Sequence, residues 1–355
     1  MNPLQVNIIG KSNGVGLARD IELLDAALRE RGHNVAVITI DAVQARRRRS
    51  ILLQLRARAG AGRRKAPTGP PPGVDLNIML EHVWLQYLDQ AKLNIAVPNP
   101  EWFDHHDRRV LQLVDQVWAK TDYTRRVFGG LGCATTYIGF DSTDRYAGEV
   151  RKERTYFHLA GKSNMKGTDR LLRVWGRHPD WPRLIVVLHR KKRPKLPALP
   201  NVDLHEGYLG DAALRAMQNQ STFHVCLSLT EGWGHYIAEA LSTAAVTVTV
   251  DAAPMNELVR PERGVLVAYG ATGTQRLATT YRFDEQQLEG AIERTISMSD
   301  AECVRIGGNA RDWFLDNKDS FAQRLETALR ALPAASREST CNGALLADVT
   351  NQLRR

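Results

Sequence analysis

The first forty residues constrain the fold more than any other stretch of the chain. Residues 5–10 form an apolar run that predicts a buried strand, and a glycine-rich stretch over 10–16 follows it. Apolar side chains at helical spacing predict a helix over 17–31, and residues 35–40 predict the next strand. A strand, a glycine-rich turn, a helix and a second strand begin a parallel, doubly wound α/β domain.

The same alternation continues along the chain. Short apolar runs predict further strands at 76–80, 93–97, 116–120, 135–140, 155–160, 184–188, 202–205, 223–227, 245–250 and 264–267. Helical patterns between them predict helices at 108–113, 122–128, 211–218, 236–242, 284–298 and 300–314. The length of 355 residues favours two domains, at roughly 100–200 residues each.

We therefore expect two Rossmann-like domains, over 1–150 and 151–317, and a helix with a tail over 318–355 that packs back toward the first domain. Ligands of open α/β sheets bind outside the carboxyl ends of the strands. Two such domains predict a central cleft faced by the loops that follow the strands.

The composition favours a cytoplasmic protein. No stretch approaches the roughly 18 consecutive apolar residues of a membrane-spanning helix. The N-terminus lacks the basic region and apolar core of a signal peptide. The four cysteines stand apart from one another in no metal-ligand spacing, as reduced thiols do, at Cys133, Cys226, Cys303 and Cys341.

The net charge of +9 is concentrated in one stretch. Nine basic residues and no acidic residue lie between Arg46 and Lys65, and a proline-rich segment continues to Gly73. Such a field favours an anionic partner: membrane lipid, an anionic glycolipid acceptor or nucleic acid. A solvated loop over 46–73 is the alternative. A second basic run, over 189–195, is a nucleotide contact or a solvated loop.

Two glutamates eight positions apart form the strongest motif. Glu231 lies in a glycine-flanked loop after a predicted strand, and Glu239 lies on the helix that follows. Glycines such as Gly234 let backbone amides approach an anion at the helix N-terminus, beside His235. A loop carboxylate can reach sugar hydroxyls, and one on the helix can accept from a ribose diol. A solvated loop residue and a helix-surface residue are the alternative reading of the pair alone.

This pattern resembles the E-x7-E motif of retaining GT-B glycosyltransferases, especially family 4. The resemblance continues through 246–259 and 264–267, so the ordered block covers about 37 residues. It implies the GT-B fold, a nucleotide-sugar donor, retention at the anomeric carbon and no metal or other cofactor. Ala252 and Ala253 stand where the family often has two glycines, so the loop geometry can differ.

The resemblance also implies roles for single residues. Glu231 would contact the transferred sugar at the reacting centre, and Glu239 would hold the ribose. The segment Met255, Asn256 and Glu257 would offer backbone amides to sugar hydroxyls or phosphate.

The segment 160–169 supplies cations to the same expected site. In the family, a cation after a glycine and a lysine before a later glycine clamp the donor diphosphate, and Lys162 and Lys166 match in kind. Fixed cations stabilise a leaving diphosphate without a metal. Two exposed lysines in a turn are the alternative. The spacing does not match a phosphate-cradling P-loop.

The first domain offers weaker signals. Gly14 and Gly16 resemble the loop that faces the donor phosphates, although a tight strand-to-helix turn needs glycine anyway. The family often has a histidine after a strand of this domain, and none stands there, so we expect Asn99 or Glu101 in its place. Glu81 and His82, after the preceding strand, also point to the expected cleft. His105 and His106, with Asp104, are interpreted as a helix cap rather than a metal site.

We therefore expect transfer of a hexose-type sugar to a glycan or lipid-linked acceptor, in bacterial cell-surface polysaccharide or lipopolysaccharide synthesis. The enzyme would be peripheral on the inner face of the plasma membrane. A sugar epimerase or phosphorylase on the same fold stays open, as does a non-catalytic module that binds nucleotide sugar or nucleic acid. Nucleic acid is not expected, because no aromatic residues interleave the arginines. The donor base, the sugar, the acceptor and the oligomeric state are left open.

Overall fold

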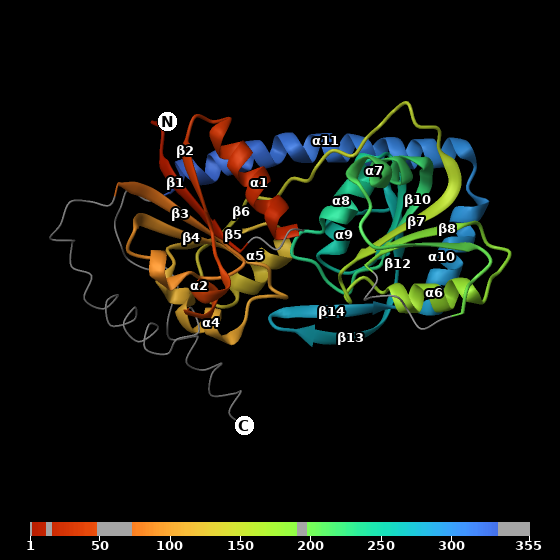
Figure 1. Cartoon of the computed structure of the whole chain (residues 1–355), viewed down its shortest axis with the longest axis horizontal. Coiled ribbons are helices and arrows are strands. Elements are labelled where there is room, and N and C mark those ends of the chain that lie inside the picture. Colours follow the sequence, from red (N-terminus) through yellow and green to blue (C-terminus); the bar gives the residue numbers. More distant parts are fainter. Residues whose placement is uncertain (1, 12–15, 48–72, 190–196, 333–355) are drawn as a thin grey trace, which may run out of the picture. The chain divides into compact units, whose positions relative to one another are not determined.

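The structure is a computed structural model that describes residues 2–11, 16–47, 73–189 and 197–332 (Figure 1). It divides into two compact units. Unit 1 holds the described residues of Met1–Phe140, Gln275–Ala278 and Ser320–Arg355. Unit 2 holds those of Asp141–Thr274 and Thr279–Asp319. Each unit is built on its own parallel sheet, as the sequence predicts.

Unit 1 contains a six-stranded sheet whose neighbouring strands pair in parallel. Across the sheet its strands are β2 (Asn34–Thr39), β1 (Gln5–Gly10), β3 (Val74–Leu80), β4 (Ala91–Val97), β5 (Gln116–Ala119) and β6 (Thr135–Tyr137). Its helices include α1 (Gly16–Arg29), α2 (Ala42–Arg47), η1 (Leu85–Tyr87), α4 (His105–Val110), η2 (Leu111–Leu113) and α5 (Asp122–Gly129). Strands such as β3 and β4 are buried over most of their length, because both faces of a parallel sheet are covered.

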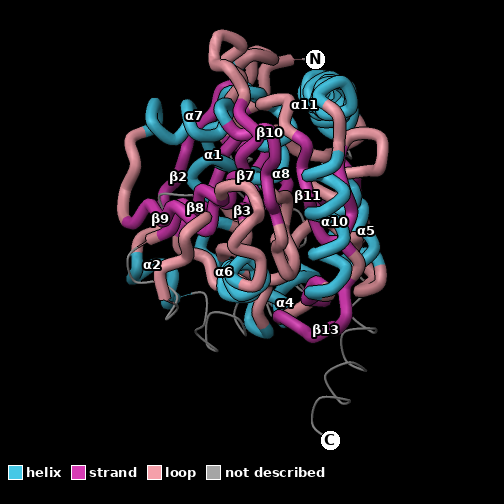
Figure 2. The backbone as a smooth tube through the Cα atoms, turned by 90° about the vertical axis from the view of Figure 1, so that its right-hand side faces the viewer, coloured by secondary structure: helices cyan, strands magenta, loops and turns pink. Residues whose placement is uncertain are grey.

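Unit 2 contains a second six-stranded sheet with the same kind of order. Across it lie β12 (Gly264–Val267), β11 (Val246–Val250), β10 (Ser221–Cys226), β7 (Glu153–Gly161), β8 (Leu184–Leu188) and β9 (Val202–Glu206). Its helices include α6 (Thr168–Gly176), α7 (Asp211–Gln220), α8 (His235–Ser242), α9 (Met255–Leu258) and α10 (Glu285–Ser297). The helices α6 and α10 lie side by side (Figures 1 and 2), joined by the ion pair of Arg177 with Glu285.

Each sheet has one point where the chain changes direction. In unit 1 the chain leaves β1 for β2 on one side and later places β3 on the other side. In unit 2 the chain leaves β7 for β8 and β9 on one side and later places β10 on the other. The loops after the two central strands separate at such a switch point, which leaves room for a ligand at the carboxyl ends of the strands.

Three features differ from the sequence prediction. The helix α11 (Asp300–Arg330) begins where predicted but does not end at residue 314. The strands β13 (Tyr269–Gln275) and β14 (Ala278–Phe283) form a hairpin that was not predicted, and neither was α6.

Glycine at 307 is needed where α11 packs on unit 2, because a Cβ there would clash with the carbonyl oxygen of Ala244.

The cores and caps agree with the predictions made for them. Cys226 is buried in unit 2, and Cys133, Cys226 and Cys303 are free thiols. Asp104 caps α4 by accepting from the amides of His106 and Asp107, so the helix-cap interpretation is confirmed. In the part of the chain that the structure describes, no helix is both long and apolar enough to span a membrane.

Candidate functional site

The strongest candidate site lies at the switch point of unit 2. The loop after β7 carries Lys162 and Lys166, and the loop after β10 carries Glu231. Because β7 and β10 are neighbouring parallel strands, their carboxyl ends lie at the same edge of the sheet. The two motifs, 65 residues apart in the case of Lys166 and Glu231, thereby come together.

Backbone contacts join these two loops directly. The amide of Leu229 donates to the carbonyl of Met165 at 2.8 Å. Gly167, with a φ of 69°, is the N-cap residue that precedes α6, and a Cβ at this position would lie 2.8 Å from the carbonyl oxygen of Leu227. Only glycine permits both this left-handed conformation and this close approach. The lysine loop is therefore fixed against the glutamate loop.

The charged centre of the site is the ion pair of Lys166 and Glu231. The ammonium nitrogen of Lys166 lies 2.5 Å from Oε1 of Glu231, and the two side chains are 15% and 16% exposed. The hydroxyl of Ser228 donates to the same Oε1 at 2.5 Å. The side-chain hydroxyl of Thr230 is buried, with no hydrogen-bond partner within the described ranges. A partly exposed cation and carboxylate thus meet beside a buried hydroxyl group.

A buried histidine fixes the residue that follows the lysine loop. His158 on β7 is fully buried between the carbonyl of Val225, 2.7 Å from Nδ1, and the hydroxyl of Thr168, 2.9 Å from Nε2. Burial lowers the pKa of His158 to about 4, so the ring is neutral at neutral pH. A carbonyl can only accept, so Nδ1 carries the proton and Nε2 accepts from Thr168. The histidine therefore ties the start of α6 to β10.

The glycine-rich loop leads Glu231 into α8. Gly234, with a φ of 98°, precedes the first residue of that helix, His235. Nδ1 of His235 lies 2.9 Å from the hydroxyl of Ser142, and the indole of Trp233 donates to that hydroxyl at 3.0 Å. Ser142 comes from the segment that begins unit 2, and no sequence motif marks it.

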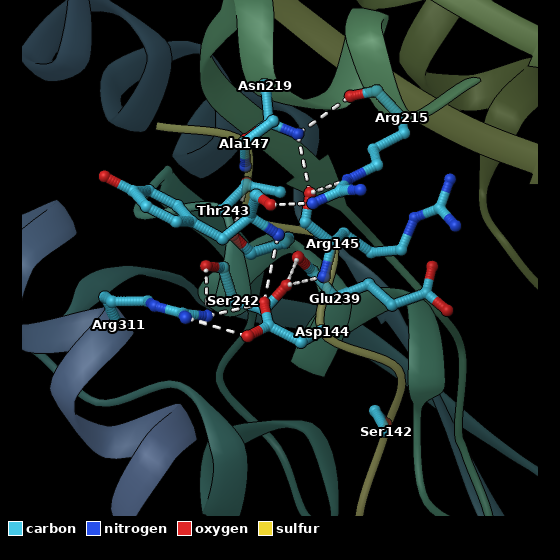
Figure 3. Close-up of polar contacts among 12 residues, drawn as sticks. Ser142, Asp144, Arg145, Ala147, Arg215, Asn219, Glu239, Ser242, Thr243 and Arg311 are labelled. Atoms are coloured by element: carbon cyan, nitrogen blue, oxygen red, sulfur yellow. Dashed lines mark hydrogen bonds and ion pairs between the residues drawn. The ribbon is translucent and has the colours of Figure 1, made fainter. Parts of the chain in front are cut away.

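Glu239 lies further along α8, in a different environment (Figure 3). Its residue is 2% exposed, and Nε2 of Gln218 donates to its Oε2 at 3.3 Å. The oxygen of the same amide accepts from Nε of Arg145 at 2.8 Å, and Arg145 also pairs with Asp211. The structure thus places Glu239 in a buried polar network with Gln218 and Arg145.

The segment 141–147 runs along α8 in this network (Figure 3). The amide of Arg145 donates to the hydroxyl of Ser242 at 3.0 Å, and the amide of Ala147 donates to the side chain of Asn219 at 2.8 Å. Asp144 pairs with Arg311 of α11. Sequence reasoning missed this segment, because its partners are distant in sequence and have no common spacing.

The remaining predicted residues of unit 2 are more dispersed. Lys162 is exposed, and it makes no ion pair with any residue that the structure describes. Met255 is buried, while the amides of Asn256 and Glu257 donate to the carbonyls of Ala252 and Pro254. Those two amides are therefore occupied within the chain, and their predicted contact with a sugar or phosphate stays a prediction.

In unit 1, two predicted residues meet after β3. Nδ1 of His82 lies 2.9 Å from Oδ2 of Asp107, and Nε2 lies 3.5 Å from Oε2 of Glu81. Glu81 has a φ of 65°, which is strained for a residue with a Cβ. Burial raises the pKa of its carboxyl group. Polar groups and strain are thus gathered at the carboxyl edge of this sheet.

Asn99 and Glu101 follow β4, the neighbour of β3. Glu101 is buried, and the side-chain oxygen of Asn99 is buried with no hydrogen-bond partner among the described residues. Gly16 begins α1. Gly14, almost all of the basic stretch 46–73, and residues 190–196 of the second basic run lie outside the described residues. No cluster of His, Cys, Asp or Glu that could hold a metal occurs in the described ranges.

Comparison with known proteins supports the fold. No protein-family model matches the chain, and no curated protein matches it in sequence. The solved structure of sucrose-phosphate synthase from Thermosynechococcus elongatus covers 94% of this chain and 100% of its own, at 14% identity and a TM-score of 0.67.

Two further structures match at similar levels. A glycosyltransferase from Rickettsia africae ESF-5 covers 93% of this chain and 98% of its own, at 12% identity and a TM-score of 0.65. HepE from Anabaena, solved in complex with UDP, covers 93% and 100%, at 16% identity and a TM-score of 0.63. At these identities the likeness establishes the fold. The chain has the two-sheet α/β architecture of GT-B glycosyltransferases, so the predicted fold class is confirmed, while the central cleft stays a prediction.

Proposed function

We propose that this protein is a retaining glycosyltransferase that takes a hexose-type sugar from a nucleotide-diphosphate sugar. The observation that carries the proposal is the Lys166–Glu231 pair at the switch point of unit 2. Structures with the same fold support it, since HepE was solved with UDP and with UDP and glucose, and an Escherichia coli trehalose-6-phosphate protein was solved with UDP-2-fluoro glucose.

Each residue has a proposed role in this reaction. Lys166, and more peripherally Lys162, would neutralise the diphosphate as it leaves with the electron pair of the broken bond. Glu231 would contact the transferred sugar. The acceptor hydroxyl would attack on the face that the diphosphate leaves, and a phosphate oxygen would take its proton. The loop of Gly234 and His235 would bind the nucleotide sugar at the start of α8.

Glu239 would hold the ribose in this proposal. Because its carboxylate is buried, a ribose diol would replace the hydrogen bond from Gln218. Met255, Asn256 and Glu257 would border the sugar, and Gly16 with Gly14 would face the phosphates. Glu81, His82, Asn99 and Glu101 would contact the acceptor or the sugar, which their polar grouping at the edge of the sheet in unit 1 supports.

The first test is nucleotide binding followed by a substitution. Thermal-shift measurements with UDP, GDP, dTDP, ADP and CMP should identify one stabilising nucleotide, since a ligand at 100 times its Kd adds about 2.7 kcal/mol. Turnover of the matching nucleotide sugar should then be abolished in Glu231→Ala, with nucleotide affinity largely kept. Glu293→Ala, on the exposed side of α10, is the control that should keep full activity. Near-full turnover by Glu231→Ala would refute the assignment.

We also propose that the acceptor is a glycan or lipid-linked glycan of the bacterial cell surface. The enzyme would work at the cytoplasmic face of the membrane, where the basic stretch Arg46–Lys65 would bind anionic lipid. Sedimentation with phosphatidylserine liposomes should fall on deletion of 46–65. Equal sedimentation of the two proteins would remove the membrane from this proposal.

A further inference from the structure

Two residues outside the predicted site, Ser228 and Tyr236, connect its two charges. Ser228 lies in the loop after β10 and is fully buried, and Tyr236 is the second residue of α8, at 8% exposure. The two hydroxyl oxygens lie 2.6 Å apart, and the amide of Ser228 donates to the phenol oxygen at 3.1 Å. Tyr236 is thus bonded twice to the residue that contacts Glu231.

The direction of these hydrogen bonds follows from the chemistry of the groups. An ionised carboxylate can only accept, so the single proton of the Ser228 hydroxyl is donated to Oε1 of Glu231. The Ser228 oxygen must then accept the proton of the Tyr236 phenol. Burial raises the pKa of that phenol well above its ordinary value, so it keeps its proton and remains a donor. A chain of donors therefore runs from Tyr236 through Ser228 to Glu231.

The ring of Tyr236 acts on the other charge. The ammonium nitrogen of Lys166 lies 3.3 Å from the centroid of this ring, a short cation–π contact. Lys166 is therefore held between the ring face of Tyr236 and Oε1 of Glu231, at 2.5 Å from that oxygen. One side chain supports the carboxylate by its hydroxyl and the cation by its ring.

Both hydrogen bonds that reach Glu231 from the described residues end on Oε1. This leaves Oε2 as the oxygen that a sugar hydroxyl can approach. Ser228 and Lys166 together set the orientation of the carboxylate, and so the direction in which Oε2 points. Without these hydrogen bonds the Glu231 carboxylate would still bind the sugar, but it would spend less time in the productive orientation.

We propose that Tyr236 is a positioning residue with two separable functions: its hydroxyl orients Glu231 through Ser228, and its ring holds Lys166 for the diphosphate. This inference rests on the proposed glycosyltransferase function and adds two residues to its machinery. If Tyr236 only filled space in the core, it would need neither the hydrogen bond of its hydroxyl nor a cation on the face of its ring.

The two functions can be separated by substitution. Tyr236→Phe keeps the ring and should lower kcat about tenfold or more, the effect of losing a hydrogen bond that supports a charged group, with KM and the Kd for UDP within about twofold. Ser228→Ala should give the same loss, and the double variant should be no worse than either single one, because both interrupt one chain. Tyr236→Leu removes the ring too, and should raise the Kd for UDP about fivefold or more.

The assay first measures hydrolysis of UDP-, GDP-, dTDP- and ADP-glucose by the wild type. All variants are then compared with the nucleotide sugar that the wild type hydrolyses. The nucleoside diphosphate of that compound replaces UDP in the measurements of Kd. Melting temperatures are measured for every variant, and Tyr208→Phe, at an almost fully exposed tyrosine, is the matched control. A wild type that neither binds nor hydrolyses any of these compounds contradicts the proposed function. An active wild type with an equally active Tyr236→Phe contradicts only this inference. This inference is also contradicted if the kcat, the nucleotide affinity and the melting temperature of the Tyr236→Phe variant all fall together.

Discussion

The buried His158 makes a quantitative prediction about acid stability. Its folded-state pKa, about 4, lies below the ordinary value of 6.5, so acid protonates the unfolded chain first. The stability that His158 contributes is therefore complete above pH 6.5 and is lost as the pH falls toward 4. At pH 5, about 1.5 pH units below the ordinary pKa, the loss is about 2 kcal/mol, because each unit corresponds to about 1.36 kcal/mol.

The substitution His158→Gln isolates this contribution. A glutamine amide can donate to Val225 and accept from Thr168, as the neutral ring does, but it does not titrate. Its packing is imperfect, so we expect the variant to be less stable than the wild type at pH 7.5.

The informative quantity is how the gap between the two proteins changes with pH. Urea unfolding at pH 7.5, 6.5, 5.5 and 5.0 should show the gap narrowing by about 2 kcal/mol toward pH 5. His224, whose pKa burial lowers to about 3, is present in both proteins and cancels from the comparison. The same substitution at exposed His105 is the control, and its unfolding curve should parallel the wild type. A gap of constant size for His158→Gln would refute the reasoning.

Three further predictions concern stability and cofactor use. Gly167→Ala should lose about 1–3 kcal/mol of stability in a urea titration and should bind nucleotide more weakly, because the φ of this residue is 69° and the new Cβ would press on Leu227. Gly210→Ala is the control and should keep its stability, because the space around Gly210 is open. Lys120→Met should lower the free energy of unfolding by about 3–5 kcal/mol, because it removes the buried counter-charge of Asp20, 2.8 Å away. The double variant with Asp20→Asn should recover part of this loss. Equal stability of the wild type and Lys120→Met would contradict this account. Excess EDTA should leave sugar transfer unchanged, since the resemblance implies a metal-independent reaction; loss of turnover that Mg²⁺ restores would reverse that expectation.

Local patterns were enough to predict the two sheets. Strands such as 76–80 and 93–97 are covered on both faces, so they are apolar almost throughout and stand out in the sequence. The glycine-flanked Glu231 stands out in the same way, and the resemblance to the GT-B family identifies the lysine before Gly167. The structure brings these two segments together.

Other features leave no local trace. The polar run 316–320 looks like a loop, yet α11 continues through it, because Asn317 and Phe321 are buried at helical spacing. The hairpin of β13 and β14 was missed because β13 is exposed almost throughout and shows no alternation. The network of Arg145, Gln218 and Glu239 joins residues 73 and 21 positions apart, so no spacing rule could reveal it.

The hydrogen bond between Leu229 and Met165 has a kinetic consequence for any donor. Because the chain's own backbone joins the lysine loop to the glutamate loop, little chain entropy is left to lose when a nucleotide binds. Association in unit 2 should then be a single step whose observed rate rises linearly with nucleotide concentration in stopped-flow experiments. Differences in affinity among nucleotides would arise mainly in how long each one stays bound.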